Sequence, residues 1–245
     1  MIDKIQKFTS FLTALVIVSA LVAFASYDHK VSNNLILMTD SSFINKKSLE
    51  KIIFLEMDTL SDEKVNFFEI EKKLHLHPHI KEVKVYKDLT GNLNVSLSQF
   101  KPVARIVSGK FSDHYVDKDG IIFPTSKNFS KRVILIHLPD IFNFESNSLT
   151  ESVFGKDLMN MINLINENDF FRKIISEIDI DRNKNIVIHP VISKQKIIFG
   201  YPDMLEEKFQ KISLFYNDIV SAKGWNTYKS VNVKFKNQII CDKFS

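Results

Sequence analysis

The chain has 245 residues, of which 44% are hydrophobic and 25% charged, so it can bury at least one sizeable core, which argues against wholesale disorder. Glycine and proline number only 6 each, a composition that excludes collagen-like and low-complexity chains. The net charge of +4 rests mainly on dispersed lysines, so we expect no nucleic-acid partner, and the single cysteine excludes a disulfide framework or a cysteine-based zinc site.

The amino terminus carries an uncharged, apolar run from Phe8 to Tyr27, which is preceded by Lys4 and Lys7. An α-helix of about 20 residues spans the hydrocarbon core of a membrane. We therefore predict a cytoplasmic tail at residues 1–7 and a transmembrane helix at residues 8–27. The lysines before the run favour a cytoplasmic amino terminus, with the bulk of the chain outside the cytoplasm.

Two other interpretations of this run stay open. Ala23-Phe24-Ala25 has the small-x-small form of a signal-peptide cleavage site, so the segment is alternatively a signal peptide that is removed on export. The third interpretation is a buried core helix, although the run lies at the chain end and is apolar on every face. The first two interpretations both export the remainder of the chain.

Residues 28–100 are predicted to form a strand, two helices and two further strands. The expected elements are a strand at residues 35–38, helices at about 48–55 and 67–76, and strands at 80–86 and 93–98. The helices follow from apolar residues at helical spacing, and the second ends before Pro78, because a proline disfavours the helical conformation in the residue before it. The last two strands alternate apolar and polar residues, which is typical of half-buried antiparallel strands.

Residues 101–245 are predicted to form a mostly antiparallel β domain with flanking helices. The expected strands lie at 115–123 as a hairpin, 133–137, 174–180, 185–189, 196–199, 231–235 and 239–241, and the expected helices at 152–166 and about 204–220. The helices have apolar stripes at helical spacing, and the strands are short apolar runs separated by turn residues. The two segments together predict an α+β fold.

Two groups of residues resemble chemical sites. His75, His77 and His79 could converge on a zinc ion, but Pro78 and the change from helix to strand predict that the rings diverge, so we expect them to be structural. Asp179 and Asp181 lie two residues apart, as paired catalytic acids could. We expect a solvated turn there instead, because the segment that begins at Asp181 has turn composition.

The common catalytic motifs are absent from the sequence. It contains no phosphate-binding Gly-x-x-x-x-Gly-Lys-Ser/Thr loop, no Gly-x-Gly-x-x-Gly, no Gly-x-Ser-x-Gly and no His-Glu-x-x-His. We therefore predict no catalytic, cofactor-binding or metal-binding residues and no small-molecule substrate.

Five segments carry a resemblance to a known family through their order and spacing. They are Leu74–Val85, Phe100–Arg105, Tyr115–Pro124, Leu138-Pro139 and Tyr228–Cys241. Together with the amino-terminal run, they resemble the FtsQ/DivIB family of bacterial cell-division proteins, in the form that such sequences take in Bacteroidetes-like bacteria.

The resemblance implies that a transmembrane helix is followed by a POTRA-like domain at residues 28–100 and an FtsQ-type β domain at residues 101–245. It implies a single-pass protein of the cytoplasmic (inner) membrane whose bulk is periplasmic. It also implies a non-enzymatic scaffold of the divisome that coordinates septum assembly without a cofactor. The alternatives are another POTRA-containing envelope assembly protein and a cell-wall enzyme.

A non-enzymatic scaffold works through exposed surfaces, and an unpaired sheet edge is one such surface. The resemblance implies that the last strand and the helix before it bind FtsB- and FtsL-like division proteins by edge-strand pairing. It links the POTRA-like domain to upstream division proteins. Carried over by position, the partner-binding residues are Val231, Val233, Phe235, Asn237 and Ile239. The alternative for these positions is an ordinary strand packed in the core.

Overall fold

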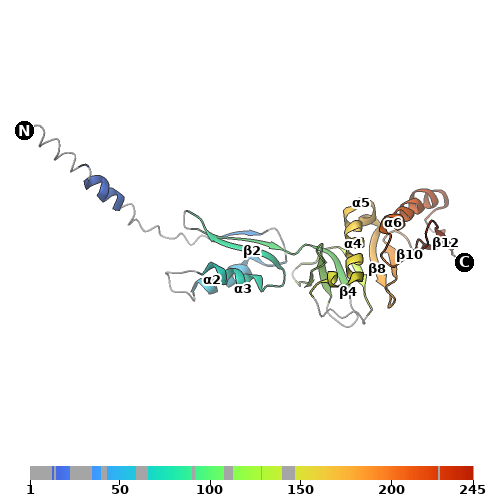
Figure 1. The fold of residues 1–245 in the computed structure, drawn as a ribbon, viewed down its shortest axis with the longest axis horizontal. Coiled ribbons are helices and arrows are strands. Elements are labelled where there is room, and N and C mark those ends of the chain that lie inside the picture. Colours follow the sequence, from blue (N-terminus) through green and yellow to red (C-terminus); the bar gives the residue numbers. More distant parts are fainter. Residues whose placement is uncertain are drawn as a thin grey trace, which may run out of the picture.

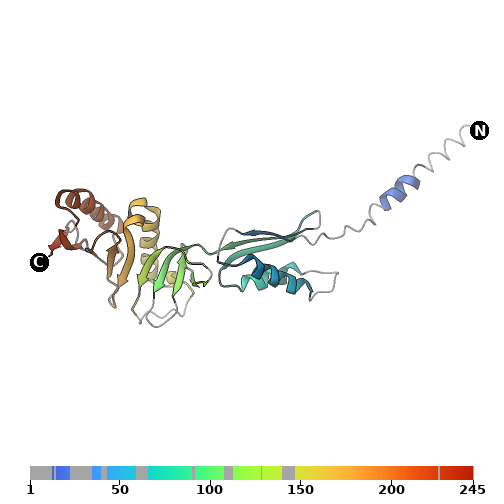
Figure 2. The ribbon, with the colours of Figure 1, turned by 180° about the vertical axis from the view of Figure 1, so that it is seen from behind.

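The structure is a computed structural model with two sheets that lie one after the other along the long axis of the molecule (Figure 1). It describes residues 13, 15–22, 35–39, 43–58, 66–89, 92–107, 113–127, 129–139, 147–225 and 227–244. Within these residues one sheet has three strands and the other nine. Figure 2 shows the same arrangement from behind.

The smaller sheet follows the strand, helix, helix, strand, strand order predicted for this part of the chain. Its elements are β1 (Leu35–Thr39), α2 (Lys46–Asp58), α3 (Phe67–His75), β2 (Ile80–Lys87) and β3 (Leu93–Gln99). β3 lies in the middle, parallel to β1 and antiparallel to β2. Both helices bury their apolar stripes against the sheet, as Leu49 of α2 and Leu74 of α3 share one core with Val95 of β3.

The larger sheet has the strand order β12-β11-β10-β9-β8-β7-β4-β5-β6. Its strands are β4 (Pro102–Val107), β5 (His114–Asp117), β6 (Ile122–Pro124), β7 (Ile134–His137), β8 (Ile175–Ile180), β9 (Ile186–Pro190), β10 (Lys196–Gly200), β11 (Tyr228–Asn232) and β12 (Ile240–Lys243). Its helices are α4 (Val153–Glu167), α5 (Asp169–Ile174), α6 (Leu205–Leu214) and α7 (Ser221–Lys223), with a short 3₁₀ turn η1 (Leu149–Glu151) and a π-helical segment η2 (Phe215–Val220).

The sheet is mixed: five of its eight strand pairs are antiparallel, as expected of a mostly antiparallel domain, and three are parallel. β7 runs parallel to both β4 and β8, and β10 runs parallel to β11. Parallel neighbouring strands need a crossover connection between them. Helices α4 and α5 connect β7 to β8, and α6 with η2 and α7 connects β10 to β11. The helices at 152–166 and about 204–220 were predicted, but α5 and the role of these helices as crossovers were not.

The helices α4, α5 and α6 cover one face of the nine-stranded sheet. Phe154 and Leu158 of α4, Phe171 of α5 and Phe209 of α6 belong to the same core as the inward-facing isoleucines of the strands, such as Ile178. Burial alternates along β8 and β9, so every second side chain of these strands lies on the face away from the helices.

An aromatic cluster joins the two sheets. The ring of Phe43 lies 5.3 Å from the ring of His79 in the smaller unit, 5.8 Å from Tyr115 on β5 and 6.2 Å from Phe123 on β6. Tyr115 and Phe123 belong to the core of the smaller unit. Close by, Lys81 of β2 contacts Asp117 and Asp119 of the larger unit at 3.3 and 2.6 Å. The junction is therefore a packed and charge-paired contact.

Most of the predicted transmembrane run at 8–27 lies outside the described residues, as does the predicted tail at 1–7. Residues 15–22 are helical, and apolar side chains among them, such as Ile17 and Leu21, are exposed. Within the described residues, none of the helices has the length and hydropathy needed to cross a membrane.

Candidate functional site

The last strand, β12, is an open edge of the nine-stranded sheet. It pairs antiparallel with β11, so that Cys241 lies opposite Val231 and Ile240 opposite Asn232. On its outer side β12 has no neighbouring strand among the described residues. An edge strand has backbone N–H and C=O groups that are free to pair with an added strand. This edge is therefore the candidate site for binding another chain.

The predicted partner-binding residues from Val231 to Ile239 do not lie on one continuous edge strand. Val231 lies in β11, which pairs on both sides, with β10 and with β12. Val233 is fully buried, and its N–H donates to the carbonyl oxygen of Ile198 on β10. These two valines are core residues, as the alternative of an ordinary strand packed in the core implies. The edge itself begins only at Ile240.

The other predicted residues lie in the connection between β11 and β12. Phe235 is 46% exposed, and Ile239 is partly buried against the core of the larger unit. Asn237 has a φ of 56°, a left-handed conformation that asparagine tolerates better than most residues. The expected strands at 231–235 and 239–241 leave the polar Lys236-Asn237-Gln238 segment between them, and the structure has a turn there.

Two side chains of α6 hold this connection in place. The Nζ of Lys211 donates to the carbonyl oxygen of Phe235 at 2.5 Å and to that of Val233 at 3.4 Å. The Oε1 of Glu207 accepts from the backbone N–H of Asn237 at 3.0 Å and lies 2.8 Å from the Lys211 Nζ. We call Glu207 and Lys211 the α6 clamp, because the charged ends of both side chains hydrogen-bond to the backbone of the turn that leads into β12.

The clamp has an electrostatic consequence. The hydrogen bond from Lys211, followed by the one from the Asn237 N–H, lowers the pKa of the Glu207 carboxyl. The ionised form of Glu207 therefore persists to lower pH than in an unpaired glutamate. Sequence reasoning missed both residues, since a Glu and a Lys four positions apart on a helix read as an ordinary solvated pair.

Exposed apolar side chains border the edge. Phe235 is 46%, Ile240 43% and Phe244 45% exposed, and all three belong to the β12 hairpin or follow it directly. Contiguous exposed apolar surface often marks a protein-binding site. The edge thus combines free backbone groups with apolar side chains.

The helical segment before β11 adds a second apolar surface. Tyr216 of η2 lies 5.7 Å, ring to ring, from Trp225 and 5.9 Å from Phe170, and both of these partners are partly exposed. The amide nitrogen of Gln195 donates to the Tyr216 hydroxyl at 2.8 Å, while burial raises the pKa of this tyrosine. π-Helical segments such as η2 are frequent at functional sites.

Of the three histidines, His77 and His79 lie close together, with ring centroids 5.5 Å apart, so the expectation that all three rings diverge is wrong for this pair. His75 is exposed on α3, His77 is half-buried and His79 is buried. The ring of His79 stacks on Phe43, and its Nε2 lies 3.0 Å from the carbonyl oxygen of Pro124 in the larger unit. Burial lowers the pKa of both His77 and His79. His79 therefore packs at the junction of the two units.

The carboxylates considered as paired acids have different surroundings. The Oδ1 of Asp181 accepts from the N–H groups of Asn183 and Asn185, each at 2.8 Å, and so forms the predicted exposed turn. Asp179 lies on β8, where its Oδ2 is 2.8 Å from the Nε2 of His189 on β9. The two acids are thus engaged in separate local contacts.

A mixed sheet flanked by helices, with a free terminal edge, defines an α+β protein with a surface suited to strand addition. Residues 101–242, which run from just before β4 into β12, match the family described as FtsQ/DivIB, C-terminal related. The chain belongs to this FtsQ/DivIB-related family, a family of non-enzymatic cell-division proteins. The resemblance noted in the sequence is therefore confirmed. No curated protein matches the chain significantly.

Proposed function

We propose that the protein is a non-enzymatic, membrane-anchored scaffold of the bacterial divisome that binds FtsB- and FtsL-like division proteins and coordinates septum assembly. Its membership of a cell-division family supports this role. The observation that carries the partner-binding part is the open outer side of β12.

The proposed interface is β12 rather than the segment 231–239. A partner strand adds to the free backbone groups of Ile240–Lys243, and its alternate side chains contact the exposed ring of Phe235 and the side chain of Ile240. Asp242 and Lys243, both exposed, supply charges of opposite sign at the rim. In this proposal Val231 and Val233 pack in the core behind the edge and hold it in place. Asn237 and Ile239 lie in the connection before β12 and set the path of the chain into that strand.

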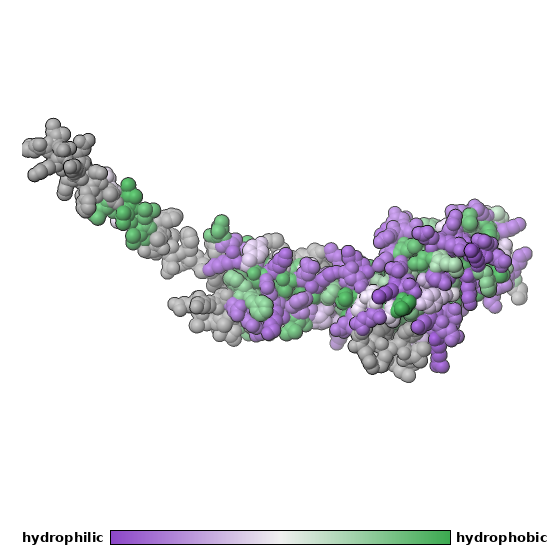
Figure 3. All heavy atoms as spheres, in the orientation of Figure 1, coloured by the Kyte–Doolittle hydropathy of each residue, from purple (hydrophilic) through white to green (hydrophobic). Residues whose placement is uncertain are grey.

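The proposed location is the cytoplasmic membrane, with a single amino-terminal span and a periplasmic bulk. The uncharged run from Phe8 to Tyr27 and the preceding lysines support this topology. Figure 3 draws the described helical residues 15–22 as an apolar surface that projects from the rest of the molecule, as expected for part of an anchor.

The smaller unit is proposed to be a POTRA-like domain that contacts upstream division proteins. Phe68 of α3 and Leu76, which directly follows α3, are exposed apolar residues that border a groove together with His75 and Val83. An exposed apolar patch of this kind fits a protein contact.

The test is recovery of partners by the tagged full-length chain from its native membranes, with mass spectrometry of the bound proteins. FtsB- and FtsL-like proteins are the expected partners. Two variants then probe the edge, Cys241→Pro and Asp242→Pro. Because neighbouring residues of an edge strand direct their N–H groups to opposite sides, one of these prolines removes an outward N–H and the other removes a bond to β11.

The variant that loses the outward N–H should keep the wild-type melting temperature and bind partners at least tenfold more weakly. The other variant should melt at a lower temperature and is the matched control. If both variants fold and bind partners as well as wild type, strand addition at β12 is wrong.

A further inference from the structure

Four titratable side chains lie on the face of the nine-stranded sheet that α4, α5 and α6 leave uncovered. His137 is on β7, Glu177 and Asp179 are on β8, and His189 is on β9. The register places His137 beside Asp179 and Glu177 beside His189. Their neighbours in sequence, such as Ile178, point into the core on the helix side. Three adjacent strands thus present a two-histidine, two-carboxylate group.

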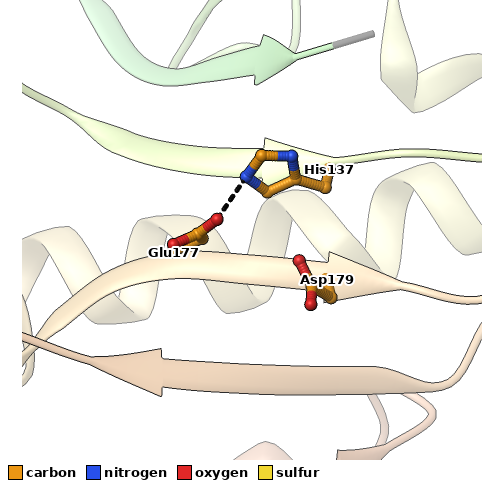
Figure 4. A group of neighbouring side chains, drawn as sticks. All are labelled: His137, Glu177 and Asp179. Carbon is orange, nitrogen blue, oxygen red and sulfur yellow. Dashed lines mark ion pairs between the residues drawn. The ribbon is translucent and has the colours of Figure 1, made fainter. Parts of the chain in front are cut away.

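Three of these residues converge (Figure 4). His137, Glu177 and Asp179 each offer one possible ligand atom, and these atoms all lie within 4.8 Å of one another. The side chains of His137 and Glu177 are 38% and 40% exposed, so an ion can reach them from solvent. Because all three side chains project from paired strands, their spacing is fixed by the sheet rather than by a loop.

The imidazole of His137 lies in close contact with the carboxylate of Glu177. Its Nε2 is buried and has no hydrogen-bond partner among the described residues, although it lies 2.5 Å from the Oε1 of Glu177. Zinc holds nitrogen and oxygen ligands about 2 Å from itself in tetrahedral geometry, so these two atoms must move apart to bind one ion. A bound cation then replaces their direct contact, since metal ligands are deprotonated.

The carboxylate of Asp179 is held by His189. The His189 Nε2 lies 2.8 Å from the Asp179 Oδ2, so the imidazole N–H orients the carboxylate. Metal-binding carboxylates are typically fixed in this way by a hydrogen bond from an outer residue. His189 is therefore a positioning residue of the group and not one of its three converging ligands.

We propose that His137, Glu177 and Asp179 bind a divalent transition-metal ion of the zinc type. Imidazole nitrogen and carboxylate oxygen are ligands that zinc accepts, and three protein ligands leave a coordination position for water. Calcium fits poorly, because it takes six to eight oxygen ligands and no nitrogen. The ion links β7 to β8 in the middle of the sheet and stabilises the fold by binding the native state. This proposal does not depend on partner binding at β12.

The test is calorimetric titration of the purified, metal-stripped, full-length chain with zinc chloride alone, alongside melting curves with and without zinc. We expect saturable binding of one zinc per chain and a higher melting temperature with zinc. His137→Asn and Asp179→Asn should each lower the affinity at least 100-fold. His189→Asn should lower it about 10- to 100-fold, as expected for loss of an outer hydrogen bond.

His75→Asn is the matched control, because His75 is an exposed histidine on α3, in the other unit. It should bind zinc with wild-type affinity. If His137→Asn or Asp179→Asn does not fold, Glu177→Gln is measured in its place, because glutamine keeps the shape of the partly exposed glutamate side chain. The proposal is overturned if the wild-type chain shows no saturable zinc binding, or if folded His137→Asn and Asp179→Asn proteins bind zinc as tightly as wild type.

Discussion

Lys211→Met removes the cation of the α6 clamp and keeps most of the apolar stem of the side chain. The buried Nζ donates to the carbonyl oxygen of Phe235 at 2.5 Å, and a hydrogen bond to a charged group contributes about 1.5–3 kcal/mol. The contact with Val233 is long at 3.4 Å, and Glu207 is partly solvated, so that ion pair adds little to the stability.

We therefore expect Lys211→Met to lower the free energy of unfolding by roughly 2–3 kcal/mol. For a domain of this size, that corresponds to a fall in melting temperature of about 4–12 °C. The turn before β12 loses its anchor, so partner binding should weaken as well, even at temperatures where the protein is folded.

The assay is a melting curve together with partner affinity for the full-length chain. Lys223→Met is the matched control, because Lys223 is an exposed lysine on α7 and should leave both quantities unchanged. If Lys211→Met melts and binds like wild type, the α6 clamp does not position the edge.

Three further predictions concern single residues. Asn237→Pro should destabilise the turn and weaken partner binding, because proline cannot adopt the φ of 56° and loses the N–H bond to Glu207, whereas Asn237→Gly should melt like wild type. Gly155→Ala should lower the free energy of unfolding by about 1–3 kcal/mol in denaturant titrations, because its Cβ would lie 1.7 Å from the carbonyl oxygen of Leu149. Burial lowers the pKa of His79 in the folded state. The contribution of neutral His79 to stability is therefore present above the unfolded pKa of about 6.5 and is lost as the pH falls through the folded pKa. Melting curves of His79→Phe should accordingly be less sensitive to acid than those of wild type.

The sequence predicted the parts of the fold that depend on local patterns. The helix at 152–166 is observed as α4 (Val153–Glu167), because its apolar stripe and the Ser152 cap, whose hydroxyl accepts from the Gly155 N–H, act within a few residues. The parallel pairings of β7 and β10 were not predicted, since they join strands that are far apart in the sequence.

The predicted partner-binding residues do not lie on the open edge of the sheet, which is β12. Val231 and Val233 alternate with polar residues, as the residues of a half-buried edge strand do, yet β12 covers the outer side of β11. β12 itself has only four residues, and these do not alternate clearly between apolar and polar. The period-two pattern that indicates a half-buried strand is therefore weak there. The metal-like group was missed for a related reason, because His137 and Asp179 become neighbours only through the pairing of β7 with β8.

Hydrogen exchange at the amides of β12 tests the central claim most directly. The full-length chain is compared alone and bound to the proposed FtsB- and FtsL-like partners, with exchange measured for Ile240–Lys243 and for the α3 surface. Strand addition predicts that partner binding slows exchange at the outward-facing N–H groups of β12, since a new strand bonds to them. Unchanged exchange along β12 in a saturated complex would contradict the proposal and place the interface elsewhere on the protein.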